Sequence, residues 1–198
     1  MSVRSFDLTG GRLEIAQQME TENEAGVVVW DAAIVLAHYL HKNPYELKGK
    51  RVVELGSGTG VVGLAAALLG ANVILTDLPR MMDLLQRNIE GNSQESQVRA
   101  LPLTWGQDLS GLEAPFDFVL ASDVVYNRHD FHKLASTLES LSGPNTKIVM
   151  SHEHREGMHE FFEILRQQGS VREVPLEELD QDWACEDISV VEVAFSIS

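Results

Sequence analysis

The segment RVVELGSGTGVVGLAAALLGANVILTDLP, residues 51–79, decides the fold. The mainly apolar run 51–55 predicts a buried strand, and glycines follow it at positions 56, 58 and 60. Residues 60–69, rich in alanine and leucine, predict a helix, and a second apolar run at 72–76 ends in Asp77. A strand, a glycine loop, a helix and a second strand that ends in an acid are typical of a nucleotide-binding βαβ unit.

The glycine loop has the features of a cofactor site. Glycines lack a Cβ atom, so the backbone of the loop can turn sharply and approach a ligand closely. A helix that begins near residue 60 points its free N–H groups and its positive end at the loop. A carboxylate at Asp77, at the end of the next strand, can accept both hydroxyls of a ribose. We therefore expect a cofactor that contains a nucleoside.

Two readings of the loop lead to different cofactors. Gly58, Gly60 and Gly63 match the pattern G-x-G-x-x-G, which would imply NAD or FAD. Glu54, two positions before Gly56, places a carboxylate at the end of a buried strand, where it is costly unless it is paired or faces a positive ligand. A pyrophosphate is negative, whereas S-adenosylmethionine carries an ammonium and a sulfonium. We therefore predict S-adenosyl-L-methionine as the cofactor, with Glu54 beside it, and a nicotinamide dehydrogenase as a distant alternative.

The remaining pattern predicts an α/β fold. Expected elements are a hairpin at 3–18 around Gly10-Gly11, helices from Asp31 to a stop at Asn43-Pro44 and at 80–91, 130–141 and 156–168, and strands at 97–102, 116–123, 146–152, 170–175 and from 188. Strands that alternate with helices indicate a parallel sheet covered on both faces, and the last two strands, with no clear helix between them, indicate antiparallel pairing. We expect one domain over 1–198, with 1–48 as its N-terminal extension, built on a Rossmann-like seven-strand sheet that is mainly parallel with an antiparallel last strand.

The composition indicates which kinds of partner and which compartment to expect. The formal net charge of −15 disfavours tight binding of nucleic acid, because phosphate backbones are negative. Cys185 is the only cysteine, so no intrachain disulfide is possible, and a reducing, cytoplasmic compartment is expected. No signal peptide and no apolar run of membrane-spanning length are evident, so no membrane contact is expected. The small, acidic chain is compatible with a monomer.

Several separate blocks resemble one known family. The order VWDAA, VVELGSGTG, LTDL, LTWG and ASDVVY is similar to that of the seven-strand protein-lysine methyltransferases often called methyltransferase family 16, from about Phe6 to Phe162. The resemblance implies a methyl donor, S-adenosylmethionine, and a protein lysine as the acceptor. Chaperones or translation factors are the kind of substrate it implies. Thr104 departs from the acid that many members carry before the tryptophan of the fourth block.

The resemblance also implies roles for particular residues. Asp123 and Tyr126, the two fixed letters of the motif D-x-x-Y, lie beside the acceptor and are the predicted catalytic residues. The predicted donor contacts are Trp30 against the methionine part, Gly56, Ser57 and Gly58 in the loop, Asp77 and Leu78 at the ribose, and Trp105 and Ala121 near the adenine.

The acceptor motif itself carries chemical information. Methyltransferases that act on planar nitrogens often place two prolines between the outer letters, and Val124 and Val125 stand there instead. The sequence therefore disfavours adenine or glutamine-amide acceptors. An alternative interpretation makes Asp123 a cap of the next helix and Tyr126 a core residue.

Other function classes stay open at this stage. A small-molecule or other-nitrogen methyltransferase and a cofactor-binding module without turnover are the two alternatives to a protein-lysine enzyme. The histidines His152, His154 and His159 do not have the H-E-x-x-H spacing of a zincin, so no metal is expected. The sequence assigns no role to His152, His154 or the loop 176–187.

Overall fold

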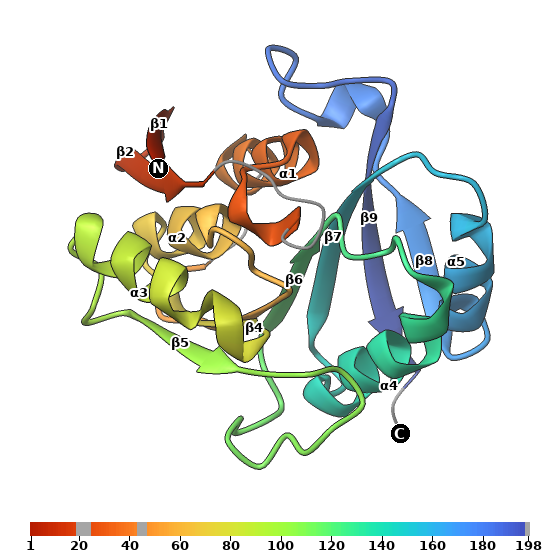
Figure 1. The fold of residues 1–198 in the computed structure, drawn as a ribbon. Coiled ribbons are helices and arrows are strands. Elements are labelled where there is room, and N and C mark those ends of the chain that lie inside the picture. The colour runs from red at the N-terminus through yellow and green to blue at the C-terminus, as the bar shows by residue number, and fades with distance from the viewer. Residues whose placement is uncertain (19–24, 43–46, 197–198) are drawn as a thin grey trace.

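The computed structural model describes residues 1–18, 25–42 and 47–196 (Figure 1). The strands are β1 Ser2–Leu8, β2 Gly11–Gln17, β3 Arg51–Leu55, β4 Asn72–Asp77, β5 Val98–Pro102, β6 Phe118–Ser122, β7 Lys147–Glu153, β8 Gly169–Glu173 and β9 Ile188–Phe195. The helices are α1 Asp31–Lys42, α2 Val61–Leu68, α3 Met82–Gly91, α4 Phe131–Leu141 and α5 Met158–Arg166, with short 3-10 helices η1 Ala25–Val27, η2 Pro79–Met81, η3 Arg128–Asp130 and η4 Leu176–Glu178. The predicted elements are confirmed with small shifts at their ends, while the predicted stop at Asn43-Pro44 lies outside the described residues.

The large sheet has the strand order β5-β4-β3-β6-β7-β9-β8. Strands β3 to β7 pair in parallel, and β9 is antiparallel to both of its neighbours, β7 and β8, as predicted. The chain builds outward from β3 in one direction and from β6 in the other, so the strand order reverses between these two strands. Ligands of open α/β sheets bind beyond the carboxyl ends of the strands at such a point.

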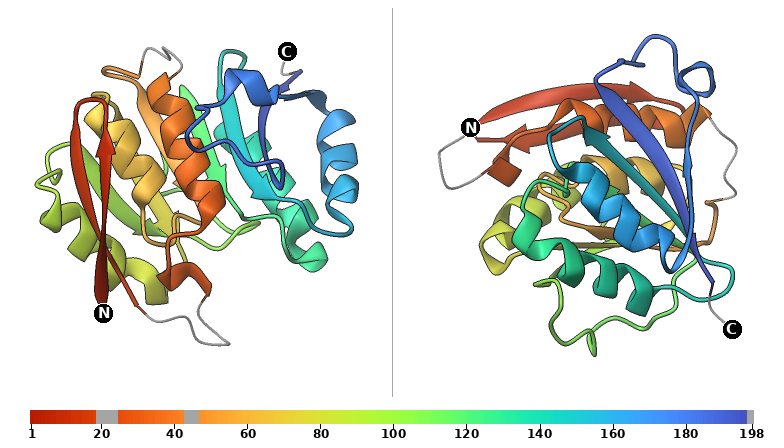
Figure 2. Two further views of the ribbon diagram at one scale, coloured as in Figure 1. Left: turned by 90° about the horizontal axis from the view of Figure 1, so that it is seen from above. Right: turned by 90° about the vertical axis from the view of Figure 1, so that its right-hand side faces the viewer.

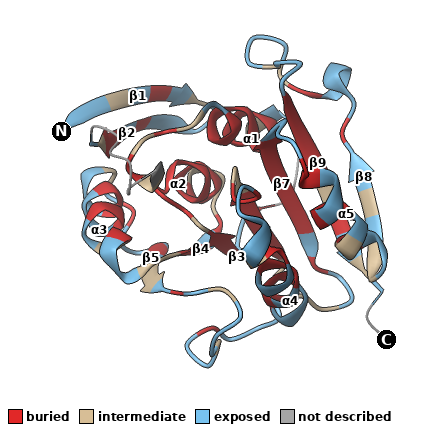
Figure 3. Ribbon diagram, turned by 45° about the vertical axis from the view of Figure 1, so that its right-hand side comes forward, coloured by how far each residue is buried: buried red, intermediate tan, exposed pale blue. Residues whose placement is uncertain are grey.

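Side chains of each strand alternate between two hydrophobic layers. On β3, Val52 packs with residues of α1, α2 and α3, whereas Val53 and Leu55 pack with residues of α4 and α5. Helices therefore cover both faces of the sheet (Figure 2). The inner strands are buried along most of their length, as the red ribbons of β7 and β9 show (Figure 3).

The N-terminal hairpin, β1 and β2, is held against α3 by two asparagine side chains. The Asn88 amide accepts from the Ala16 N–H at 2.8 Å and donates to the Ala16 carbonyl at 3.0 Å and the Thr59 carbonyl at 2.8 Å. One helical turn further on, Asn92 accepts from the Glu14 N–H at 2.8 Å and donates to its carbonyl at 3.0 Å. Because alternate residues of a strand direct their N–H and C=O groups to the same side, the two amides together pair with the edge of β2.

Asn88→Ala should destabilise the protein by about 3 kcal/mol, because it leaves buried backbone groups of Ala16 and Thr59 without partners. Asn92→Ala removes the same kind of contact at a partly exposed position, where water can replace the amide, and should cost roughly 1 kcal/mol or less. Urea unfolding of the two variants measures the difference. Equal losses would contradict the role given to burial.

Candidate active site

A cavity of about 570 Å³ opens at the carboxyl ends of β3, β4 and β6, where the strand order reverses. Its volume lies in the usual range for small-molecule and cofactor sites. The lining residues are Gly26, Val28, Trp30, Ala33, Gly56, Ser57, Gly58, Thr59, Asp77, Leu78, Arg80, Met81, Leu103, Thr104, Trp105, Ser122, Asp123, Val124, Tyr126, Asp130, Lys133 and Arg155. The predicted site residues other than Glu54 and Ala121 are therefore brought together in one cavity.

The glycine loop between β3 and α2 forms one wall of the cavity. Gly56 and Gly58 have φ angles of 62° and 55°, which side-chain-bearing residues rarely adopt. A Cβ atom on Gly58 would lie 2.9 Å from the Gly26 carbonyl oxygen, and one on Gly56 would lie 2.7 Å from Val124 Cγ1. Both glycines are thus required by the close packing of the loop against neighbouring segments.

Asp77 connects the end of β4 to the glycine loop. Its Oδ2 accepts from the Gly58 N–H at 2.7 Å, and its Oδ1 accepts from the Leu78 N–H at 2.7 Å. Burial raises the pKa of Asp77, and the two N–H donors oppose that rise. Each carboxylate oxygen retains a second acceptor site, so the group can still receive the two hydroxyls of a ribose.

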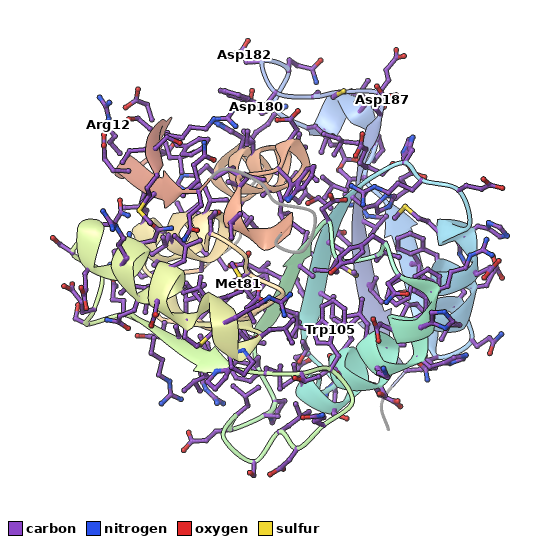
Figure 4. All side chains as sticks on the ribbon, in the orientation of Figure 1. Arg12, Met81, Trp105, Asp180, Asp182 and Asp187 are labelled. Carbon is purple, nitrogen blue, oxygen red and sulfur yellow. The ribbon has the colours of Figure 1, made fainter. Side chains whose placement is uncertain are left out.

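The chemistry of the lining fits S-adenosylmethionine better than a dinucleotide. Met81 and Trp105 both line the cavity and appear near the centre of the view in Figure 4, away from the loop at its top that carries Asp180, Asp182 and Asp187. Such apolar side chains suit an adenine. Of the three cations that line the cavity, Lys133 and Arg155 are each paired with a carboxylate, at 2.8 and 2.7 Å. The third, Arg80, lies near the Asp77 carboxylate and lowers the pKa of that group, so each lining cation has an acidic neighbour and a pyrophosphate would find little excess positive charge.

Glu54 does not line the cavity, which corrects the expectation that its carboxylate faces the donor. Its side chain lies on the α2 side of β3, where Oε2 accepts from the Gly63 N–H at 2.9 Å and Oε1 has no hydrogen-bond partner. Complete burial raises the pKa of Glu54 to about 8. A pKa raised this far favours the neutral carboxyl group, which can lie buried between β3 and the first turn of α2 without a positive ligand.

Glu54→Gln should remove a pH dependence of stability. Between pH 4.5 and about 8 the folded protein keeps a proton on Glu54 that the unfolded chain releases, so stability falls as pH rises, by roughly 1.4 kcal/mol per pH unit at most. The glutamine variant has no such proton. Urea unfolding at pH 5, 6, 7 and 8 should show the variant gaining stability relative to the wild type at each step, whereas parallel pH profiles would contradict the assignment.

Ala121 is likewise outside the cavity lining. It is the fourth residue of β6 and is fully buried in the layer that contains Val53, and its neighbour Ser122 lines the cavity in its place. Side chains alternate along a strand, so the side chain of Ser122 faces the cavity where that of Ala121 does not. The predicted contact of Ala121 with the adenine stays a prediction.

Asp123 follows β6 directly and is held tightly. It has a φ of 51°, its N–H donates to the Ser151 carbonyl at 2.8 Å, and its side chain is 9% exposed. Burial raises the pKa of Asp123, and the guanidinium of Arg155 opposes that rise. A carboxylate that lines the cavity and has an elevated pKa can both hold an amine and accept a proton from it.

Tyr126 lies at the mouth of the cavity and is 63% exposed. Partial burial, followed by the nearby carboxylate of Asp77, raises the pKa of its hydroxyl. The next short helix, η3, is capped by the side chain of Asn127, which accepts from the His129 N–H at 3.2 Å. The alternative interpretation, in which Asp123 caps the helix and Tyr126 belongs to the core, is therefore wrong.

The sequence did not point to several lining residues. Arg80 and Met81 follow Asp77 within η2, and Gly26 and Val28 come from the segment before α1. Arg80 and Met81 could have been predicted because they come shortly after the end of a strand. Gly26 and Val28 could have been predicted because they are close to Trp30 in the sequence. Lys133 on α4 had no such local signal, whereas Arg155, beyond β7, lies in the segment that the sequence already placed near the rim of the active site.

Metal ligands and membrane-spanning helices were considered for the described residues alone. Within 1–18, 25–42 and 47–196, no three histidine, cysteine or acidic side chains are placed to share a metal ion. In the same part of the chain, none of the helices has the length and apolar character needed to cross a membrane.

Comparison with known proteins identifies the family. A model of the lysine methyltransferase family matches residues 8–168. Protein N-lysine methyltransferase METTL21A of Danio rerio is 40% identical over 178 residues, which cover 87% of this chain and 81% of that protein. EEF1A lysine methyltransferase 3 of Xenopus tropicalis is 39% identical over 166 residues, which cover 82% of this chain and 74% of that protein.

Solved structures support the fold. The 16S rRNA N2 G1207 methyltransferase RsmC of T. thermophilus, in complex with AdoMet and guanosine, has a TM-score of 0.70 at 17% identity and covers 98% of this chain and 50% of its own. The glycopeptide N-methyltransferase MtfA, in complex with S-adenosyl-L-methionine, has a TM-score of 0.66 at 13% identity and covers 83% of this chain and 94% of its own. The family match and the site geometry agree: the chain belongs to the lysine methyltransferase family and is an enzyme that uses S-adenosylmethionine.

Proposed function

We propose that this enzyme methylates lysine ε-amines of non-histone proteins, with a translation factor or a chaperone as its substrate. The observation that supports this most directly is the nearly buried carboxylate of Asp123 in the same cavity that Asp77 and the glycine loop line. The name of the Xenopus tropicalis relative, an EEF1A lysine methyltransferase, supports a translation-factor substrate. We further propose that the enzyme is a single-domain monomer that works in the cytoplasm, away from nucleic acid and membranes.

Residues of this chain would bind the donor and position the acceptor. Trp30, Ser57 and Asp77 would bind the donor, with Leu78 and Trp105 completing its site. S-adenosylmethionine supplies a methyl group activated by a sulfonium. Asp123 would hold the acceptor nitrogen in line with that group, and most of the rate acceleration would come from this positioning.

Asp123 would also help the acceptor to lose its proton. A lysine ammonium has a reference pKa near 10.4 and no lone pair with which to attack. Its proton has to leave before or during transfer, and the elevated pKa of Asp123 makes this carboxylate a competent acceptor. Tyr126, exposed at the cavity mouth, would contact the aliphatic part of the incoming lysine side chain.

The test is transfer of tritium from S-adenosylmethionine to proteins of a cytosolic extract, resolved on a gel. The wild type should label a discrete protein band, and Asp123→Asn should lose at least 99% of that label while still binding the donor, because the variant keeps its shape but loses the charge and the proton acceptor. Asp108→Asn, which changes an exposed carboxylate that accepts two hydrogen bonds from Ser110, is the matched control and should label the band normally.

Label that appears only in a small-molecule fraction would refute a protein substrate. Donor binding without any transfer, equal in the wild type and in Asp123→Asn, would instead favour a cofactor-binding module. Digestion of the labelled band and amino-acid analysis should place the tritium on methylated lysine.

A further inference from the structure

Arg155 lies between two carboxylates at the acceptor end of the cavity. Its Nη2 is 2.7 Å from Asp123 Oδ2 and 3.1 Å from Glu153 Oε2. The residue follows β7, lines the cavity and has a side chain that is 34% exposed. The guanidinium therefore occupies the space in front of the carboxylate that we assign to the acceptor amine.

We propose that the Asp123 carboxylate is the binding group for the acceptor ammonium and that Arg155, paired with Asp123 and Glu153, fills this place in the free enzyme, so that a substrate lysine must displace Arg155 from Asp123 to react. The inference rests on the proposed function, since it assumes that lysine is the acceptor. It makes Arg155 a specificity-determining residue.

Charge balance favours an exchange of cations. Two carboxylates face one guanidinium, so the cluster has a net charge of −1 and can take a second cation without an excess of positive charge. Arg155 can give up Asp123 and keep Glu153, whose side chain is 52% exposed. The bond between Arg155 and Asp123 is then replaced by a charge-assisted hydrogen bond between the acceptor ammonium and Asp123, so the displacement costs little free energy.

The two partners of the ion pair differ in how firmly they are held. Asp123 is fixed by its N–H bond to Ser151 and accepts a weak bond of 3.4 Å from the Glu153 N–H. Arg155 belongs to an exposed segment, 153–156, which begins at the last residue of β7 and leads toward α5. A guanidinium on an exposed segment can leave, whereas the carboxylate stays in place.

The identity of the residue at position 155 also matters chemically. A guanidinium stays charged in proteins, presents five N–H donors but no acceptor, and in this charged form is not a nucleophile. An ammonium in the same place can lose a proton and become a nucleophile. Arginine is thus an inert occupant of the acceptor site, and lysine would be a reactive one.

The decisive variant is Arg155→Lys, which should methylate itself. The introduced Nζ would attack the methyl carbon, the carbon–sulfur bond would break with its electron pair on sulfur, and S-adenosylhomocysteine would leave. The proton from the nitrogen would pass to Asp123 and then to water. Purified variant with S-adenosylmethionine alone should gain methyl groups at position 155, and the rate per molecule should not depend on enzyme concentration, because the reaction is intramolecular.

Two controls accompany this variant. Arg166→Lys places a new lysine in another exposed Arg–Glu pair, with Glu163 at 2.8 Å and outside the cavity, and should stay unmethylated at position 166. Asp123→Asn in the Arg155→Lys background should abolish self-methylation. Peptide mass mapping measures methylation at the substituted positions of all three proteins, and donor binding verifies that each protein is folded.

A second variant tests the displacement itself. Arg155→Gln keeps much of the side-chain length but removes the charge that competes for Asp123. The extract concentration that gives half-maximal labelling should fall roughly fivefold, with the maximal rate and the donor affinity unchanged. A lower maximal rate would mean that Arg155 holds Asp123 in place for catalysis, and the proposal would then be overturned.

The outcomes separate this inference from the proposed function. If the wild type labels an extract protein but position 155 of folded Arg155→Lys stays unmethylated, the acceptor site lies elsewhere and the inference fails alone. If Arg155→Lys methylates itself, the inference holds even where the extract yields no labelled band.

Discussion

Asp77→Ala should weaken binding of S-adenosylmethionine by about a hundredfold or more. The carboxylate would lose two charge-assisted hydrogen bonds to the ribose, each contributing roughly 1.5–3 kcal/mol. It also holds the glycine loop through the Gly58 and Leu78 N–H groups, both at 2.7 Å, so the variant should leave the loop less well ordered for the donor. Isothermal titration of the purified proteins with the donor measures the loss directly.

A second cavity carboxylate provides the control for Asp77. Asp130 also lines the cavity, but its oxygens are engaged by Lys133 and Asn127, at 2.8 and 2.7 Å, at the start of α4. Asp130→Ala should therefore change the donor affinity by less than about threefold. An unchanged affinity in Asp77→Ala, in protein shown by circular dichroism to be folded, would refute the ribose contact.

Gly63→Ala should destabilise the protein by about 3 kcal/mol, although helix propensity alone predicts a gain of about 1 kcal/mol. A Cβ atom at this position would collide with Leu75 Cδ2 and would lie 2.8 Å from Glu54 Oε2 and 3.0 Å from Val73 Cγ1. All three neighbours are buried on β3 and β4, so none can move away freely. Overpacking at the contact between α2 and the sheet should outweigh the propensity gain, and chemical unfolding measures which effect is larger.

Gly91→Ala is the matched substitution in α3. A Cβ atom there has no neighbour within 4 Å, and Gly91 does not have a positive φ. That variant should be neutral or slightly more stable than the wild type. A similar gain in Gly63→Ala would show that α2 can shift away from the sheet, which would contradict the close packing of α2 on β3 and β4.

Gly63 does not decide between the two readings of the glycine loop. It completes the dinucleotide pattern G-x-G-x-x-G, but in the structure it allows α2 to pack closely on β3 and β4 and does not line the cavity. Close packing of helix on strand is needed in any βαβ unit of this kind, so this glycine does not discriminate between cofactors.

The sequence by itself determined the elements, their type and the position of the site. Apolar periods of 2 and 3.6 residues and the glycine positions are local properties, so the βαβ unit at 51–79, the hairpin and the antiparallel last strand were all predictable. The location of Asp77 and Asp123 followed as well, because residues that end parallel strands meet at one edge of a sheet.

The tertiary structure decided which way particular side chains point and which charges pair. Glu54 was expected to face the donor, yet the pleat of β3 places it on the side of Val52, against α2. The pair of Asp123 with Arg155 joins residues from the ends of β6 and β7, brought together only because these strands are neighbours in the sheet. Long-range contacts of this kind depend on strand order and on the orientation of a few side chains, and no local pattern in the sequence encodes either.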